Sequence, residues 1–374
     1  MTTLIAWRNL VHDPVRFLTT LVGIVFSVVL IAVQLGMLLG FSRTTAGLID
    51  NTDADIWIAP RGTTNVDQSA QLPERTFFQA LKTEGVSAVS RHIVRFVPWR
   101  RPQGGTQLVI VVGIDRRTMM ARPWNLVEGK LDDLALPNSV IIDRLYARKL
   151  GVSAIGDVVE INRRRALIVG FTQGARTFTQ APYVFTSYLN ALKYTDIQDG
   201  DASYMLVQVS NPADAGRVAV QLAAQAPNAD VMTARAFAEK TRNYWIFTTG
   251  AGSALILGAA LGALVGIVIV SQTLYAATME RLSEYATLSA IGAPGKYLNA
   301  IVIKQALISG FLGYIIAAVI ATGVTIFAKS SPAAIILPAW AMLLLGVAAL
   351  AMCTLSAVVA IRKVMKIDPT SVFR

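Results

Sequence analysis

The sequence predicts a membrane α-helical fold with four transmembrane helices and an extracytoplasmic α+β domain inserted between helices 1 and 2. Hydrophobic residues make up 54% of the chain and charged residues 15%, and the mean hydropathy is +0.52, far from the average of soluble proteins. Four uncharged runs are each long enough to cross the roughly 30 Å hydrocarbon core of a bilayer, which takes about 20 residues. A long polar segment, residues 42–245, separates the first run from the second.

These runs set the expected boundaries along the chain. The last run contains Pro332 and Pro338, so we expect its helix to begin near Pro338, because proline interrupts a helix. The resulting assignment is an N-terminal cytoplasmic interfacial helix at 1–16, transmembrane helices at 17–41, 246–278, 305–328 and 338–361, the extracytoplasmic domain with helical stalks at 42–245, a cytoplasmic coupling-helix loop at 279–304 and a cytoplasmic tail at 362–374.

Basic residues in the short connecting segments predict the orientation of the spans. Nine of them flank one side, whereas the turn between the third and fourth spans holds only Lys329. Since lysine and arginine accumulate on the cytoplasmic side, both termini and the loop at 279–304 are expected in the cytoplasm. The net charge of +11 is then explained by these flanks and by anionic lipid, without nucleic acid. The nine residues are Arg8, Arg16, Arg281, Lys296, Lys304, Arg362, Lys363, Lys366 and Arg374.

The N-terminal run is expected to remain in the protein as the first span. Its apolar core is too long for the apolar region of a signal peptide, and it has no clear small-x-small cleavage site. Before it, Arg8 and Arg16 lie among apolar residues, as in an interfacial helix whose arginines reach lipid phosphates. A simple basic flank would serve the topology equally well.

The polar segment predicts a mixture of short strands and helices in no strict alternation, which defines an α+β domain. A helix continues past the first span to about Asn51, and a last helix at 234–245 leads into the second span. Asn211 as N-cap and Pro212 at the first helical position give a firm helix start. The expected strands are 55–59, 107–113, 140–143, 158–161, 166–171 and 204–209, and the expected helices are 74–83, 144–150 and 212–225.

The charged stretch between the second and third spans predicts a short amphipathic helix. Its apolar residues recur every third position, at Leu282, Tyr285, Leu288 and Ile291, and its polar residues fall largely on the other side. Gly292 and the glycine and proline residues after it are expected to end this helix. Such a helix is suited to docking into a soluble partner, but on pattern alone an ordinary polar loop is an equal alternative.

The same stretch resembles a known family signature. It reads Glu280-Arg281-x-x-Glu284-x-x-x-Leu288-x-Ala290-x-Gly292-Ala293, which resembles the coupling-helix signature of FtsX/MacB-type (type VII) permeases of ABC transporters. The resemblance implies that this segment sits in a groove of the ATPase subunit. Tyr285 and Gln305 replace the isoleucine and glutamate that the family usually has. The implied ATPase-coupling residues are Glu280, Arg281, Glu284, Tyr285, Leu288, Ile291 and Gly292.

The N-terminal residues and residues 141–171 also resemble FtsX/MacB-type segments, so the resemblance covers the whole chain. Without a fused ATPase domain, the chain is most similar to split permeases such as DevC. The resemblance implies a non-catalytic subunit of the bacterial cytoplasmic (inner) membrane. Its expected partners are an ABC ATPase that binds ATP and Mg, a second permease copy, and often a membrane fusion adaptor and an outer-membrane channel.

The implied mechanism is mechanotransmission, in which ATP hydrolysis by the ATPase moves the extracytoplasmic domain and drives export of an envelope or periplasmic substrate. The alternative is an FtsX-like signalling role, in which the same movement activates an envelope hydrolase. A gene for an adaptor beside this one would favour export, whereas a gene for a peptidoglycan hydrolase would favour signalling.

The predicted spans carry small residues but no charged ones, so the usual marks of an ion or proton pathway are missing. Gln34 and Gln272 are the most polar side chains near their centres. Glycines recur every fourth residue on one face of the second span, which allows close helix packing. That packing could lie within one chain or between two copies, and the pattern does not separate these alternatives. The residues are Gly258, Gly262 and Gly266.

Catalytic, metal and cofactor chemistry is not expected. One cysteine, Cys353, and two distant histidines, His12 and His92, are too few for a zinc site or an intrachain disulfide. No Walker A loop is present, so ATP must be hydrolysed elsewhere. Two candidates for contact with a partner remain in the outer domain, although a solvated charged turn is the more ordinary explanation of the first. These candidates are the turn at Arg163, Arg164 and Arg165 and, in a polar aromatic loop at 171–185, Phe178.

Overall fold

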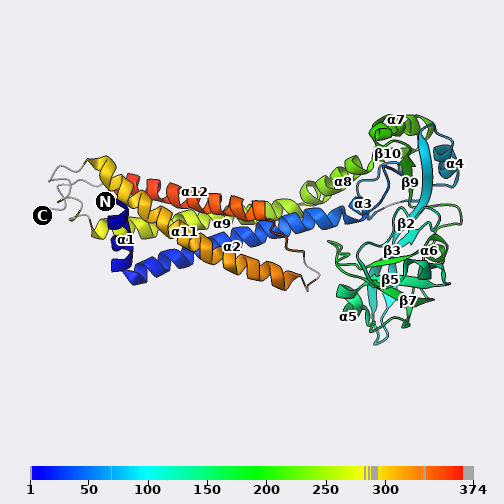
Figure 1. Ribbon diagram of the computed structural model, residues 1–374, viewed down its shortest axis with the longest axis horizontal. Coiled ribbons are helices and arrows are strands. Elements are labelled where there is room, and N and C mark those ends of the chain that lie inside the picture. Colours follow the sequence, from blue (N-terminus) through cyan, green and yellow to red (C-terminus); the bar gives the residue numbers. More distant parts are fainter. Residues whose placement is uncertain are drawn as a thin grey trace. The chain divides into compact units, whose positions relative to one another are not determined.

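The computed structural model describes residues 2–68, 70–281, 284, 287, 294–329, 331 and 334–364. The chain divides into two compact units. The first comprises residues 1–39, 253–329 and 335–374, and the second comprises residues 40–252 and 330–334. Four long apolar helices, with an α+β domain between the first and the second, make up the described fold (Figure 1).

The first unit is built from helices only, within the part of the chain that the structure describes. Helix α1 is Thr2–His12, and the four helices long and apolar enough to cross a membrane are α2 (Pro14–Thr45), α9 (Ala251–Glu280), α11 (Gly295–Ala328) and α12 (Ala339–Val364). Helix α11 begins ten residues before the predicted third span, so it includes part of the loop assigned to 279–304. The division between the two units falls inside α2, between Leu39 and Gly40.

The break between α1 and α2 has a local cause. Asp13 lies between them, and its Oδ1 accepts a hydrogen bond from the backbone N–H of Arg16 at 3.1 Å. Pro14 opens α2, where the missing N–H of proline leaves no hydrogen bond unmade. Asp13 therefore ends one helix and caps the next, and the chain turns there rather than continuing to residue 16 as one interfacial helix.

Small side chains allow the four long helices to pack closely. Ser356 Oγ of α12 donates to the carbonyl oxygen of Ile267 in α9 at 3.1 Å, and Tyr314 Oη of α11 donates to that of Met342 at 2.8 Å. Such interhelical bonds satisfy hydroxyl groups that lipid could not satisfy. The main buried cluster is Ile24, Val28, Val270, Leu274, Val302, Ala306, Ala317, Ala349, Met352, Cys353, Ala357 and Ala360.

In the second unit, the described residues form one mixed sheet of ten strands in the order β10-β1-β9-β2-β3-β8-β5-β7-β4, with β6 pairing β2 and β7. The pairs β3–β8 and β5–β7 are parallel, and the other pairs are antiparallel. The strands are β1 (Ile56–Pro60), β2 (Val86–Arg100), β3 (Thr106–Ile114), β4 (Leu126–Gly129), β5 (Ser139–Asp143), β6 (Val158–Ile161), β7 (Arg164–Thr172), β8 (Tyr183–Ser187), β9 (Tyr204–Val209) and β10 (Ala229–Thr233).

Helices cover this sheet, so its central strands are apolar on both faces. Residues Val109 and Val111 of β3 point into one buried cluster, and Ile110, Val112 and Ile114 point into another. The helices are α3 (Gly47–Asp50), α4 (Arg75–Leu81), α5 (Ala147–Leu150), α6 (Tyr188–Tyr194), α7 (Ala215–Gln225) and α8 (Ala234–Asn243), with short 3-10 turns at Leu131–Ala135, Arg144–Tyr146 and Pro212–Asp214 and a π-helical segment at Tyr244–Thr248.

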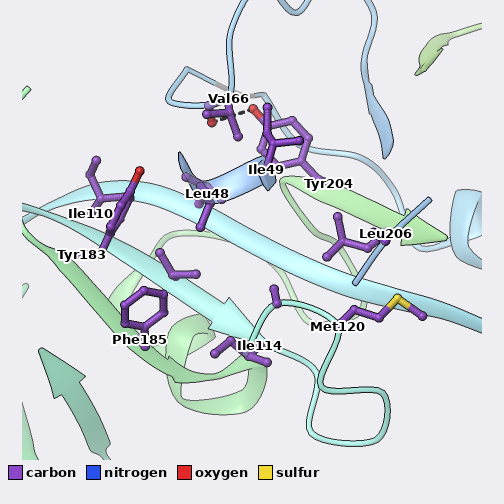
Figure 2. Close-up of a cluster of buried hydrophobic side chains, with 14 of the residues drawn as sticks. Leu48, Ile49, Val66, Ile110, Ile114, Met120, Tyr183, Phe185, Tyr204 and Leu206 are labelled. Carbon is purple, nitrogen blue, oxygen red and sulfur yellow. Dashed lines mark hydrogen bonds between the residues drawn. The ribbon is translucent and has the colours of Figure 1, made fainter. Parts of the chain in front are cut away.

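The second of these clusters contains the short helix that follows α2. Figure 2 shows Leu48 and Ile49 of α3 beside Ile110, Tyr183 and Tyr204 of the sheet. Leu48 is 1% exposed and Ile49 is 2% exposed. The hydroxyl of Tyr204 donates to the carbonyl oxygen of Val66 at 2.8 Å, which fixes the neighbouring loop to the same core. The segment after α2 is thus part of the hydrophobic core of the outer domain.

Several predicted elements are confirmed, and others were missed or misplaced. Strands β6 and β9 have the predicted bounds. Asn211 caps the predicted helix at 212–225, whose first turn, Pro212–Asp214, is a 3-10 turn that leads into α7. The segment at 171–185 is not a loop throughout, because its ends belong to β7 and β8 and only 173–182 connects them. Arg164 and Arg165 lie in β7, so only Arg163 belongs to the turn. The helix predicted at 234–245 is α8 as far as Asn243, and the π-helical segment Tyr244–Thr248 follows it directly.

Candidate coupling site

The predicted coupling motif begins at an ion pair with the N-terminal helices. Glu280, the last residue of α9, accepts hydrogen bonds from both terminal nitrogens of Arg16, each at 2.5 Å. Asp13 Oδ2 lies 3.6 Å from Arg16 Nε. The guanidinium fork matches the two carboxylate oxygens, so the pair fixes orientation as well as distance. The Glu280 side chain is 61% exposed, so water and salt screen this pair and it contributes little to stability.

The next residue of the motif binds the same N-terminal segment. Arg281 Nη1 donates to Asn9 Oδ1 at 2.5 Å, and its Nη2 donates to the Asn9 carbonyl oxygen at 3.1 Å. Glu284 Oε2 lies 3.8 Å from Arg281 Nη1. On its other side α1 packs along α11, where Lys304 Nζ lies 2.5 Å from the hydroxyl of Thr2. Helix α1 is therefore held both by the start of the coupling segment and by α11.

A cavity of about 220 Å³ lies among these groups. Gln305 of α11 lines it and is 5% exposed. An amide at this position supplies hydrogen-bonding groups without adding a fourth carboxylate beside Asp13, Glu280 and Glu284. Polar groups of α1, α2, α9 and α11 meet apolar side chains such as Leu10 and Phe17 around this cavity. The polar lining residues include Asn9, Asp13, Arg16, Glu280, Arg281 and Gln305.

The structure places the predicted coupling residues in different surroundings. The Glu280 and Arg281 side chains are engaged with Arg16 and Asn9 of the same chain, whereas Glu284 is exposed. The roles of Asn9 and Asp13 were not predicted, although the Asp13-Pro14 pair is a helix-start signal that could have indicated the turn. Tyr285, Leu288, Ile291 and Gly292 lie outside the described residues, so their roles remain predictions.

The glycines of α9 face helices of the same chain. A Cβ at Gly258 would lie 2.8 Å from Gln34 Nε2, and one at Gly262 would lie 3.2 Å from Leu30 Cδ2, both on α2. At Gly266 it would lie 2.3 Å from Met352 Sδ of α12. At Gly258 and Gly266 these distances are shorter than real Cβ contacts, and at Gly262 the distance is tight, so a larger residue at any of the three would require its neighbour to shift. Of the two alternatives, the structure fills this face from within one chain.

The predicted partner contacts in the outer domain differ from one another. Arg163 has a positive φ of 64° in the β6–β7 turn, and Arg164 and Arg165 are exposed. Their role in binding a partner remains a prediction. Phe178 is instead half-buried, and its ring lies against the rings of Phe41 and Trp245.

The spans, the outer domain and the charged segment between α9 and α11 together define a class: a multi-pass membrane protein with a large extracytoplasmic domain. Residues 17–225 match the family described as MacB-like periplasmic core domain, and residues 256–369 match the family described as FtsX-like permease C-terminal. The chain belongs to the FtsX/MacB-type family of ABC transporter permeases.

Known proteins similar to this chain include uncharacterized ABC transporter permeases of two Mycobacterium tuberculosis strains, CDC 1551 / Oshkosh and H37Rv. Each is 23% identical over 383 residues, with 98% of both chains covered. Among solved structures, the extracellular domain of the noncanonic ABC-type transporter YknZ from Gram-positive bacteria has a TM-score of 0.36 at 17% identity, covering 48% of this chain and 98% of its own. The periplasmic region of MacB from Actinobacillus actinomycetemcomitans has a TM-score of 0.38 at 14% identity, covering 52% of this chain and 96% of its own.

Proposed function

We propose that this permease couples ATP hydrolysis by a separate ATPase subunit to movement of its extracytoplasmic domain. We further propose that this movement drives export of an envelope or periplasmic substrate through an adaptor and an outer-membrane channel. The observation that carries the proposal is the packing of both helical connections into the core of the outer domain. Leu48 and Ile49 of α3 and Phe237 of α8 are buried in one cluster with the sheet.

Close packing makes these connections mechanically firm. Protein interiors are as dense as organic crystals, so a helix whose side chains are interdigitated with a sheet moves with that sheet. Trp57 of β1 contacts the Phe237 ring of α8 at 5.4 Å between centroids. Arg242 of α8 binds Asp50 of α3 at 2.5 Å, which joins the two connections to each other. A displacement of α3 and α8 would therefore be carried into the outer domain.

Contacts within the helical unit support the same mechanism. Arg16 of α2 is bound to Glu280 of α9, and Arg281 is bound to Asn9 of α1, so movement of the coupling segment would shift these helices together. The middle of each span is uncharged in the sequence, which favours transmission of motion over conduction of ions or protons. Substrate would then be handled outside the bilayer.

The proposed assembly contains two permease copies and two ATPase subunits, with ATP and Mg bound by the ATPase. We place the chain in the bacterial cytoplasmic membrane, with both termini in the cytoplasm. The apolar face at Leu288 and Ile291 would dock into the ATPase, and α1 would lie at the lipid surface. Leu4, Trp7 and Val11 on α1 are exposed, as that position requires.

The experiment combines co-purification with a distance measurement. The permease is purified with its ATPase, and bound proteins are identified by mass spectrometry. Spin labels at Arg164 and Ile326, in a Cys353→Ala background, then report the distance between the outer domain and α11 in lipid nanodiscs. ATP is expected to change this distance. An unchanged distance during ATP hydrolysis would contradict mechanotransmission, and recovery of a peptidoglycan hydrolase in place of an adaptor would replace export with signalling.

The docking face is tested with two variants that add the same charge. Leu288→Asp would place an unpaired carboxylate in an apolar interface at a cost of several kcal/mol, and each 1.4 kcal/mol lowers affinity about tenfold. We therefore expect ATPase binding to fall by at least about a hundredfold. Thr287→Asp, at an exposed neighbouring position, is the control and should bind nearly normally. Equal binding by both variants would contradict the docking face.

A further inference from the structure

The loop at 173–182, between β7 and β8, places one aromatic ring between two helical segments. The Phe178 ring lies 4.1 Å from the ring of Trp245 and 5.4 Å from that of Phe41, measured between centroids. Phe41 belongs to the end of α2, and Trp245 belongs to the π-helical segment after α8. All three residues are half-buried and belong to the second of the two compact units, which contains the outer domain. Phe178 therefore bridges the two segments that connect the outer domain to the spans.

The base of this loop is fixed to the sheet. Asp143, at the end of β5, is fully buried, and its Oδ2 accepts hydrogen bonds from Thr172 Oγ1 at 2.9 Å and from the Ala175 N–H at 2.6 Å. Across the loop, Thr177 Oγ1 donates to the carbonyl oxygen of Ala181 at 2.8 Å. A buried carboxyl group that accepts these two hydrogen bonds is a firm anchor, because loss of either bond would leave a buried polar group without its partner. The loop is thus attached to both β5 and β7.

The helical side of the bridge has an unusual backbone. Residues Tyr244–Thr248 form a π-helix, a rare conformation that occurs frequently at functional sites. Trp245 lies in this segment, so its ring is presented where the helix departs from regular α geometry. The ion pair of Arg242 with Asp50 lies one turn earlier on α8. The two connections are therefore joined at two successive levels, first by charge and then by the aromatic ring of Phe178.

We propose that Phe178 is a clip that fastens the end of α2 and the π-helical segment to strands β5 and β7, so that movement of these helices is transmitted to the sheet. The clip rests on the proposed function, and it assigns to one side chain the step between helix movement and domain movement. Leu48 and Phe237 attach the helices to a buried cluster that includes residues from β1 to β7, and Phe178 adds a second attachment through the loop anchored at β5 and β7. Loss of the clip should therefore leave folding and ATP hydrolysis intact but reduce the movement of β5 and β7.

The test uses the complete complex of permease and ATPase with the spin-label pair at Arg164 and Ile326, since Arg164 lies in β7. Phe178→Ala should keep at least about half of the ATPase activity of the unmodified complex and lose more than half of the ATP-dependent change in distance. Phe178→Tyr should restore most of that change. Phe78→Ala is the matched control, because Phe78 is 48% exposed on α4 and should leave both measurements unchanged.

The outcomes separate the clip from the function on which it rests. If ATP changes the distance equally in Phe178→Ala and in the unmodified complex, the clip is wrong and mechanotransmission stands. If ATP changes no distance in the unmodified complex, mechanotransmission fails and the clip fails with it. A loss of ATPase activity together with the movement would assign Phe178 to folding rather than to transmission, and hydrogen exchange across β5 and β7 would show that loss of structure directly.

Discussion

At the scale of single residues, the outer domain buries two ionisable side chains whose pKa values are shifted in opposite directions. Burial raises the pKa of Asp67 to about 7, and the neighbouring indole N–H of Trp245 acts in the opposite direction. Burial lowers the pKa of His92 to about 4, against the effect of the Gly113 carbonyl oxygen 3.0 Å from its Nδ1. Tyr183, which faces Asp67, is kept neutral because burial raises its pKa well above 10.

The two shifts have opposite consequences for stability. Asp67 has a raised pKa in the folded state. Its contribution to the free energy of unfolding is therefore fully present below its unfolded pKa of about 4, and it is lost as the pH rises through about 7. His92 has a lowered pKa, so its contribution is present above about 6.5 and is lost as the pH falls through about 4. Between about pH 4.5 and 6.5 the free energy of unfolding falls with pH because of Asp67 and rises with pH because of His92, so the two changes largely cancel.

Asp67→Asn should reveal how His92 alone makes the free energy of unfolding depend on pH. The variant is expected to lose roughly 2–3 kcal/mol of unfolding free energy as the pH falls from about 6.5 to 4.5, whereas the unmodified protein changes much less. It should also be the more stable protein at about pH 8, because the buried carboxylate is gone. Thermal or denaturant unfolding of the purified full chain in detergent measures both effects. Identical pH profiles for the two proteins would show that Asp67 ionises as freely in the folded state as in the unfolded state.

At the scale of elements, the helices of the membrane unit are held together by small residues and a few polar contacts. Gly262 of α9 faces Leu30 and Ile31 of α2, whereas a Cβ at Gly323 of α11 would meet nothing within 4 Å. Two glycines in long apolar helices thus have different roles, one at a close helix crossing and one at an open surface. The difference comes from their neighbours and not from the local sequence.

Gly262→Leu should separate α9 from α2 and destabilise the membrane unit by about 1–3 kcal/mol, as overpacked cores usually do. Gly323→Leu is the matched control and should melt close to the unmodified protein. Thermal unfolding in detergent, combined with size-exclusion chromatography, distinguishes packing within a chain from packing between chains. A Gly262→Leu protein with normal stability but a smaller oligomer would assign this face to a second copy instead.

At the scale of the whole molecule, the charge distribution determines which side of the membrane each segment occupies. Arg281 follows the second long helix and Lys296 and Lys304 lie in the first part of the third, whereas Lys329 is the only basic residue between the third and fourth. Charge counted over short loops sets orientation, while a domain as large as residues 42–245 crosses the membrane regardless of its charge. The outer domain is therefore expected on the side opposite to the coupling segment.

Cysteine labelling in intact spheroplasts tests this orientation. In a Cys353→Ala background, a cysteine replacing Arg164 should react with a membrane-impermeant maleimide, because Arg164 is exposed in the outer domain. A cysteine replacing Ser283 should react only after the membrane is permeabilised. Labelling of Ser283→Cys in intact cells, with protection of Arg164→Cys, would reverse the whole topology and remove the coupling segment from the reach of an ATPase.

The amino-acid sequence by itself determined the number of long apolar helices, the insertion of an α+β domain between the first two, and elements such as β6, β9 and the Asn211 cap. These depend on the composition and periodicity of neighbouring residues, which are local properties of the chain. Strand β2 escaped prediction because Arg91, His92 and Arg95 interrupt its apolar pattern, and their positions are explained only by neighbouring elements. His92, for example, is accommodated by the carbonyl oxygen of Gly113 on β3.

Only the tertiary structure decided which distant residues meet. Arg16 and Glu280 are 264 positions apart, and nothing near either residue in the sequence indicates the other. The same holds for Gly266 against Met352, and for Phe178, whose ring lies between those of Phe41 and Trp245 of its own chain. Contact of Phe178 with a partner stays a prediction. Local patterns determine helices, strands and caps, because those are made by neighbouring residues. Contacts between elements depend on the tertiary arrangement, because residues far apart in the sequence meet only when helices pack and strands pair in a particular order.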